Sequence, residues 1–326
     1  MAPAANSPRT SSHKPALAWF AGFGSGWVFL LVVLGAFTTS IGAGMVFPDW
    51  PLSNGSLNPT GWLTDLAMFA EHSHRLTAGV MSLITVALAL WLHRTEARAW
   101  LRKLAWFAVG LVLVQALVGG LRVLLDHLHV AMVDTSVGRL FAMLHACLAQ
   151  FFVCTLVAIA VSCSRGWIAR SIPVSCEVRR AGSICCLLLF VQLAIAAVMR
   201  HSFAGLAIPT FPFSTPDGGL LPELWNFRIG IHFAHRVMAV ILAVALLWFA
   251  LKVRLDRGST IGMRMGASAI VTLITLQIAL GAKIIWSLRA ADVTTAHVLV
   301  GALTLAVTFW LTWLAHRDVV EGKSAP

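Results

Sequence analysis

Long apolar segments separated by short polar ones make up almost the whole chain. Each of eight such segments runs for roughly 18 or more residues, long enough for a helix to cross a hydrocarbon core of about 30 Å. The apolar positions are continuous rather than alternating, which excludes a transmembrane β-barrel. The pattern predicts an all-α polytopic membrane protein, with spans at residues 19–41, 69–92, 104–125, 138–162, 182–199, 229–251, 265–287 and 292–315.

The chain contains an internal duplication. Adding 161 to the residue number carries Glu71 onto His232, and His74-Arg75 onto His235-Arg236. The same offset relates the loops that precede these segments, because Ala43-Gly44, Pro48 and Pro51 fall on Ala204-Gly205, Pro209 and Pro212. One offset that serves separate segments indicates a repeat. We therefore expect two pseudo-symmetric four-helix bundles, an N-terminal half at residues 19–165 and a C-terminal half at 181–316.

Charge placement predicts the orientation of the spans. The net charge is +11, yet 16 of the 24 basic residues fall in segments that share the side of the N-terminus. This bias is typical of cytoplasmic loops, so both termini are expected in the cytoplasm and no nucleic-acid partner is needed to explain the charge. We expect a bacterial plasma (inner) membrane protein with a disordered tail at 1–18, a cytoplasmic linker at 166–180 and a second tail at 317–326.

Four histidines occupy corresponding places near the outer ends of their spans. His74 and His145 lie on the second and fourth spans of the N-terminal half, and His235 and His297 on those of the C-terminal half. Facing helices about 8–10 Å apart can hold a planar ring between two imidazoles, and histidine is a common axial ligand of haem iron. The pattern predicts two haem sites. Zinc or copper is the competing interpretation and needs further donors, of which only Glu71 or His232 is near; the six cysteines form no CxxC.

Two kinds of charged residue accompany these histidines. Glu71 lies three residues before His74, on the same helix face, and is a candidate catalytic acid or base; the simpler alternative is a carboxylate that complements the helix dipole. Because haem carries two propionates, nearby arginines are candidate contacts, although each could equally be a snorkelling side chain. The candidates near the outer surface are Arg75, Arg122, Arg200, Arg236 and Arg289.

The motifs together resemble the heme A synthase (Cox15/CtaA) family over nearly the whole chain. They are Ala43-Gly44-Met45 with Pro48-Asp49-Trp50-Pro51, Glu71-x-x-His74-Arg75, Met199-Arg200-His201 with Ala204-Gly205-Leu206, His235-Arg236, His145 and His297. Some family members carry a cysteine pair in the first outer loop, but residues 45–70 of this chain contain no cysteine. A disulfide-dependent step is therefore not expected here.

The resemblance implies an activity and a division of labour. Members of the family oxidise the C8 methyl group of heme O through an alcohol to a formyl group, giving heme A for cytochrome oxidase. By resemblance, His235 and His297 ligate a permanent haem b, His74 and His145 ligate the substrate haem, and Glu71 is essential. Heme O synthase and an electron-transfer partner are expected beside the lipid bilayer, and a homo-oligomer is compatible with the sequence. Two alternatives stay open: a di-haem b-type cytochrome that exchanges electrons with quinone, and a non-catalytic haem carrier.

Overall fold

The computed structural model describes residues 11–322, and the eight predicted spans are confirmed as eight long apolar helices. Hence the chain is a multi-pass helical membrane protein. The helices are α1 (Pro15–Ser40), α2 (Leu66–Thr95), α3 (Ala99–Leu124), α4 (Val137–Cys163), α6 (Cys176–His201), α7 (Phe227–Leu255), α8 (Ile261–Trp286) and α9 (Ala291–Ala315).

Most of these helices extend beyond the apolar segments that predict them. Helix α1 begins at Pro15 instead of residue 19, since proline is well suited to the first helical position. Helix α6 begins at Cys176 instead of residue 182, where the Ser175 hydroxyl caps it by accepting from the Val178 amide. A span predicted from apolar residues ends where the first charged residue occurs. The helix itself can continue for a further polar turn outside the hydrocarbon core of the membrane.

The linker and the C-terminal segment contain more structure than expected. Short helix α5 (Arg165–Ala169) begins at the last residue of the predicted N-terminal half, continues into the predicted linker and buries Trp167. Short helix α10 (Arg317–Val320) follows α9 and buries Arg317 and Asp318. Within the predicted N-terminal tail, residues 1–10, including Arg9, lie outside the described residues; so do residues 323–326, including Lys323.

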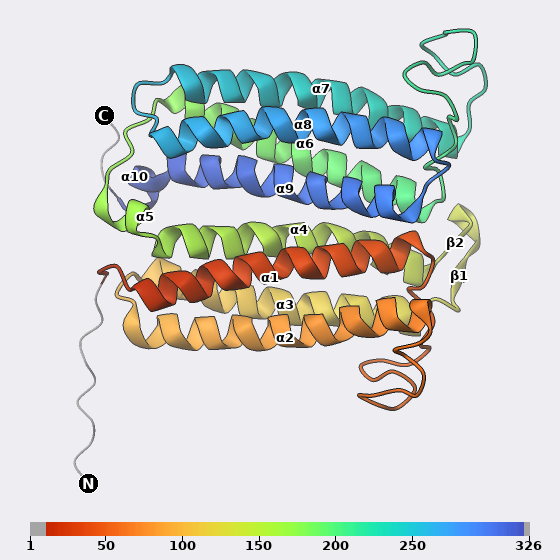
Figure 1. Ribbon diagram of the computed structural model, residues 1–326, viewed down its shortest axis with the longest axis horizontal. Coiled ribbons are helices and arrows are strands. Elements are labelled where there is room, and N and C mark those ends of the chain that lie inside the picture. Colours follow the sequence, from red (N-terminus) through yellow and green to blue (C-terminus); the bar gives the residue numbers. More distant parts are fainter. Residues whose placement is uncertain (1–10, 323–326) are drawn as a thin grey trace.

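The eight helices form two groups, visible as the upper and lower parts of Figure 1. Helices α1 to α4 pack in sequence and α4 returns to α1; helices α6 to α9 do the same. The groups meet where α1 and α4 contact α9 and where α4 contacts α6. These groups coincide with the two predicted halves, while an exact symmetry relation between them stays a prediction.

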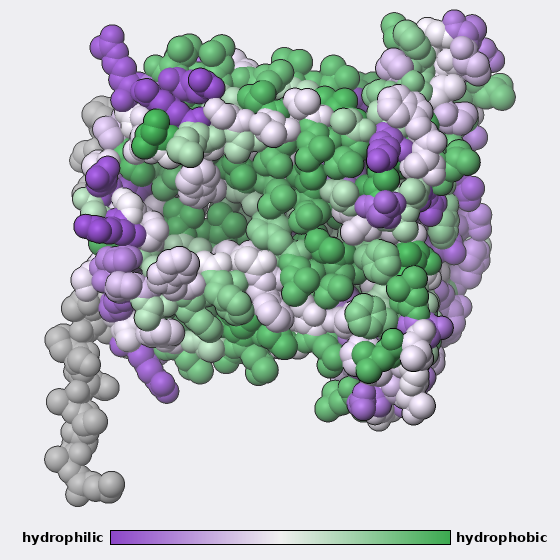
Figure 2. Space-filling model, in the orientation of Figure 1, coloured by the Kyte–Doolittle hydropathy of each residue, from purple (hydrophilic) through white to green (hydrophobic). Residues whose placement is uncertain are grey.

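The surface matches a membrane environment. Figure 2 shows a broad hydrophobic band over the middle of the helices, with hydrophilic residues gathered at both ends. One end carries the connections at residues 41–65 and 202–226, here called the first and second outer loops, together with a small hairpin of β1 (His129–Val130) and β2 (Thr135–Ser136). A single 3₁₀ turn, η1 (Ala131–Val133), joins the two strands. The candidate functional residues lie toward this end.

Candidate functional site

The four predicted histidines lie in two pairs inside the two helix groups. His74 on α2 and His145 on α4 are close enough to interact electrostatically, and so are His235 on α7 and His297 on α9. Each pair therefore joins the second and fourth helices of one half. The structure brings together the residues that the sequence pairs.

Glycines allow close approach to three of the four rings. A Cβ at Gly35 of α1 would fall 2.8 Å from Cε1 of His74, and one at Gly119 of α3 would fall 2.9 Å from Cε1 of His145. In the C-terminal half, a Cβ at Gly281 of α8 would lie 3.4 Å from Cε1 of His297. The rings thus lie against bare backbone, a kind of packing that larger residues would disturb.

Glutamines on neighbouring helices contact three of the histidines. Nδ1 of His145 lies 3.1 Å from the Gln115 carbonyl oxygen, an arrangement that places the proton on Nδ1 and leaves the Nε2 lone pair for a ligand. Gln192 Nε2 lies 3.1 Å from His235 Nδ1, and Gln277 Nε2 lies 3.2 Å from His297 Nε2. No such glutamine contacts His74 among the described residues, and Leu31 stands where the duplication would place one.

These residues fit a haem better than a zinc or copper ion. Nδ1 of His74 and Nδ1 of His297 are buried without a hydrogen-bond partner, which is costly unless a ligand changes their surroundings. Within residues 11–322, no group of three His, Cys, Asp or Glu side chains could hold a metal ion. A haem iron needs only two axial imidazoles, because its other donors come from the porphyrin.

Glu71 makes contacts that its spacing from His74 does not predict. The carboxylate is buried, and Oε1 forms a 2.6 Å ion pair with Arg75 Nη2. Oε2 accepts from the amides of Val46 at 2.7 Å and Phe47 at 3.2 Å, both in the first outer loop. Glu71 therefore links α2 to this loop.

Arg75 and Arg236 also bind the backbone of the outer loops, and their propionate contacts stay a prediction. Arg75 donates to the carbonyl oxygens of Phe47, Asp49 and Leu52. Arg236 donates to those of Ile208, Thr210 and Phe213, each displaced by 161 from its counterpart. The guanidinium groups are occupied by the protein's own carbonyl groups.

Arg200 lies at the boundary between the halves. Its Nη2 donates to the Ala36 carbonyl oxygen at 2.8 Å and to the Ser40 hydroxyl at 2.9 Å, so an α6 side chain reaches the end of α1. Arg200 is within electrostatic range of His297, Arg122 and Arg289. This cluster of arginines, in contrast to the loop-bound pair, could receive an anionic group.

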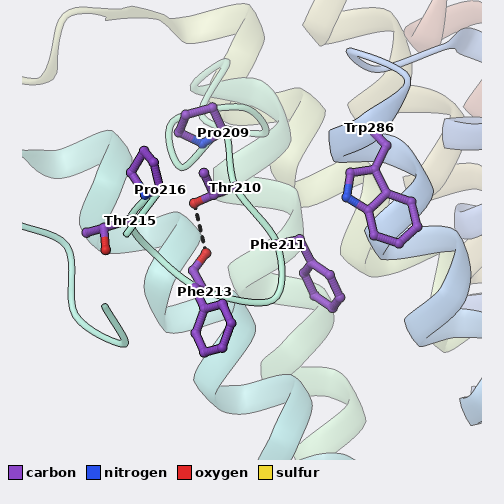
Figure 3. Close-up of a pocket in the computed structure, with 7 residues that line it drawn as sticks. All are labelled: Pro209, Thr210, Phe211, Phe213, Thr215, Pro216 and Trp286. Atoms are coloured by element: carbon purple, nitrogen blue, oxygen red, sulfur yellow. Dashed lines mark hydrogen bonds between the residues drawn. The ribbon is translucent and has the colours of Figure 1, made fainter. Parts of the chain in front are cut away.

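A surface cavity of about 320 Å³ lies apart from the histidine pairs. Figure 3 shows it between the second outer loop and Trp286 at the end of α8, with the Thr210 hydroxyl bonded to the Phe213 carbonyl oxygen. Phe211 meets Trp286 edge-on, with ring centroids 6.2 Å apart. No candidate histidine lines this cavity, and we assign it no part in the site.

Sequence reasoning missed Gln192 and the loop carbonyl groups. Gln115 and Gln277 share an offset of 162, whereas Gln192 has no echo because Leu31 occupies the matching position. Backbone acceptors carry no sequence signal of their own. The repeated prolines of the outer loops and the repeated His-Arg pairs were the only traces of their interaction.

Comparison with known proteins gives a consistent picture. The chain is 32% identical over 309 residues to a heme A synthase of Symbiobacterium thermophilum, covering 91% of this chain and 94% of that one. It is 24% identical over 321 residues to a heme A synthase of Exiguobacterium sp., covering 96% and 97%. A heme A synthase of Listeria monocytogenes is 27% identical over 276 residues, covering 83% and 85%. The model of the COX15-CtaA family, described as cytochrome oxidase assembly protein, matches residues 18–309, and the chain therefore belongs to this family.

Proposed function

We propose that this protein is a heme A synthase that oxidises the C8 methyl group of heme O through an alcohol to a formyl group. Family membership and the names of the relatives support the reaction. The observation that carries the proposal for this chain is that each half contains one pair of inward-facing histidines. In each pair, one buried ring nitrogen has no hydrogen-bond partner: Nδ1 of His74 in the N-terminal half and Nδ1 of His297 in the C-terminal half. The product is suited to assembly of cytochrome oxidase.

The two halves take different roles in this proposal. His235 and His297 hold a haem b, which supplies a one-electron carrier when bound, and His74 and His145 hold heme O as the substrate. Gln115 and Gln192 orient His145 and His235 by their contacts with ring and backbone atoms. Glu71 supports turnover in the N-terminal half, where it holds the first outer loop to α2.

Arginines at the boundary between the halves are the better candidates for propionate contacts. Arg122, Arg200 and Arg289 form no ion pair with a described carboxylate, whereas Arg75 is paired with Glu71. Arg122 and Arg200 are half-buried, whereas Arg289 is exposed. A half-buried guanidinium without an ion-pair partner favours a carboxylate ligand. From the candidates predicted from the sequence we therefore retain Arg122 and Arg200, together with Arg289, which is within electrostatic range of Arg200.

The proposed location is the bacterial plasma membrane, with both termini in the cytoplasm. The basic residues near the α5 and α10 end of the molecule support this orientation through the positive-inside bias. Reporter fusions after residues 58 and 215 should score as extracytoplasmic, and fusions after residues 97 and 257 as cytoplasmic. The reverse pattern would overturn the orientation.

Chromatography of extracted haems tests the function. The protein should be co-expressed with a source of heme O, purified in detergent and extracted. Heme A or its alcohol precursor beside haem b is the expected result. Haem b alone would favour the quinone-linked cytochrome, and unaltered heme O in a stable complex would favour the carrier.

A further inference from the structure

The contacts of Glu71 form a clamp between α2 and the first outer loop. One carboxylate oxygen binds Arg75, and the other accepts the Val46 and Phe47 amides. The side chains are 4% exposed for Glu71 and 13% exposed for Arg75, so water competes little for these bonds. Three donors on one buried carboxylate hold both oxygens in place.

Arg75 extends the clamp along the loop. Its donors reach the carbonyl oxygen of Asp49 at 2.7 Å and that of Phe47 at 3.3 Å, and a further bond reaches Leu52. Residues 46–52 are therefore attached to the first turns of α2 at both ends. Loss of Glu71 would free two amides and leave the Arg75 charge unpaired.

The clamped loop carries Trp50 to the N-terminal haem site. The indole of Trp50 lies on Gly120 of α3, so close that a Cβ at Gly120 would overlap it. The neighbouring Gly119 is the residue that faces His145. A chain of contacts thus runs from Glu71 through the loop and Trp50 to the helix surface beside this ligand.

The C-terminal half shows what this position does when no acid is present. His232 replaces Glu71 there, accepting the Ile208 amide at 3.2 Å, and Ile208 corresponds to Phe47. Arg236 Nε lies 3.3 Å from His232 Nε2 and the same guanidinium binds the three corresponding carbonyl oxygens. The task shared by both positions is to anchor the loop, and an imidazole performs it without a carboxylate.

We propose that Glu71 and Arg75 are positioning residues of the substrate-haem site, and that Trp50 on Gly120 forms the wall they position. Glu71 acts through the loop and not by proton transfer to or from the substrate. This inference rests on the proposed function only in assigning heme O to the N-terminal half. The clamp itself is a property of the protein without ligand.

Hydrogen exchange and haem analysis of Glu71→Ala and Glu71→Gln test the clamp. Glu71→Ala removes the acceptor of two amides, so exchange in residues 45–52 should become at least about tenfold faster, while the Gln carbonyl keeps most of the protection. Heme O content should fall in the same order, with haem b unchanged and product per bound heme O near wild type. The inference is overturned if loop protection is unaffected in Glu71→Ala. It is also overturned if product disappears while loop protection and heme O content stay at wild-type values, because that pattern indicates proton transfer by Glu71.

Gly120→Ala tests the wall without touching the clamp. The added methyl group should displace Trp50 and lower heme O retention several-fold, with haem b unchanged. Gly110→Ala is the matched control, because a Cβ at Gly110 of the same helix meets nothing within 4 Å. Heme O retention in Gly120→Ala equal to that in Gly110→Ala would remove Trp50 from the proposal. If the wild-type protein forms no heme A, the proposed function fails, whereas loop exchange still decides the clamp.

Discussion

The first and second outer loops are anchored by the same backbone groups but by different chemistry. Arg75 and Arg236 bind three carbonyl oxygens each, in the same register. The side chain next to the arginine is the Glu71 carboxylate in the N-terminal half and the His232 imidazole in the C-terminal half. Glu71 accepts three donors, whereas a neutral imidazole such as His232 accepts at only one ring nitrogen. The first loop is therefore held more firmly by the protein itself.

The histidines proposed as haem ligands differ between the halves in the opposite sense. Both histidines of the C-terminal half have a glutamine neighbour, Gln192 or Gln277, whereas in the N-terminal half only His145 has one. Polar neighbours fix the orientation of a ligating imidazole. Under the proposed division of roles, the glutamine neighbours of the C-terminal half would help it to retain a haem. The N-terminal half, which would have to release its product, would depend instead on the well-anchored first outer loop.

Removal of the axial ligands should give the largest effect. His235→Ala or His297→Ala should abolish the low-spin haem b spectrum, because the iron loses one of its two imidazoles. His74→Ala should keep that spectrum and lose bound heme O. Absorption spectra and extracted haems of the purified variants measure both. Persistence of the haem b spectrum in both C-terminal variants would contradict the assignment of the halves.

Gln192→Leu converts the surroundings of His235 to those of His74. Loss of a neighbour that orients a ligand typically lowers metal affinity about 10–100-fold, so haem b should dissociate more readily from this variant. The measurement is transfer of haem b to an excess of apomyoglobin. Gln150→Leu is the control, since Gln150 on α4 is buried but forms no hydrogen bond to a candidate histidine among the described residues. Equal rates of haem loss in the two variants would argue against the retention role of Gln192.

Arg75 and Arg236, which anchor the first and second outer loops, should differ in their contribution to stability. Arg75→Ala leaves a buried carboxylate unpaired, which typically costs about 3–5 kcal/mol, whereas Arg236→Ala leaves neutral acceptors and should cost about 1–3 kcal/mol. Thermal melting in detergent, followed by circular dichroism, should show the larger decrease for Arg75→Ala. Arg228→Ala, at an exposed position in the first turn of α7, is the control. A larger decrease in melting temperature for Arg236→Ala than for Arg75→Ala would contradict this prediction.

The helices and the histidine pairs could be predicted from the sequence because each has its own residue-type signal. Apolar length fixes a span, and a repeated His-Arg pair fixes a repeated position. The partners of Glu71 and Arg75 could not be predicted in this way. Their acceptors and donors are main-chain groups of Val46, Phe47, Asp49 and others, and backbone groups are the same at every residue.

Contacts at the end of the molecule opposite the outer loops, here called the inner end, were harder to predict for a different reason. Arg98, Trp167 and Glu321 come from distant parts of the chain, and no repeat marks them. Arg98 pairs with Glu321 at 3.1 Å, and Trp167 Nε1 donates to the same carboxylate at 2.6 Å. The sequence predicts that charged residues between spans are solvated, whereas here they join the end of α10 to α5 and to the α2–α3 turn.

Acidification should weaken the contact between Glu96 and Arg98 at the inner end, where Arg98 Nε lies 3.0 Å from Glu96 Oε1. Burial acts to raise the pKa of Glu96, but hydrogen bonds from Arg98 and its charge outweigh burial and lower the pKa from its ordinary value of 4.5. A carboxyl whose pKa is lowered by folding stabilises the protein above its ordinary pKa, and this contribution is lost as the pH falls through the lowered value. The melting temperature should therefore decrease below about pH 4.5, by roughly a few degrees. Glu96→Gln should flatten this decrease, whereas Glu223→Gln, at an exposed position in the second outer loop, should not. An unchanged pH dependence in Glu96→Gln would show that other carboxylates carry the acid sensitivity.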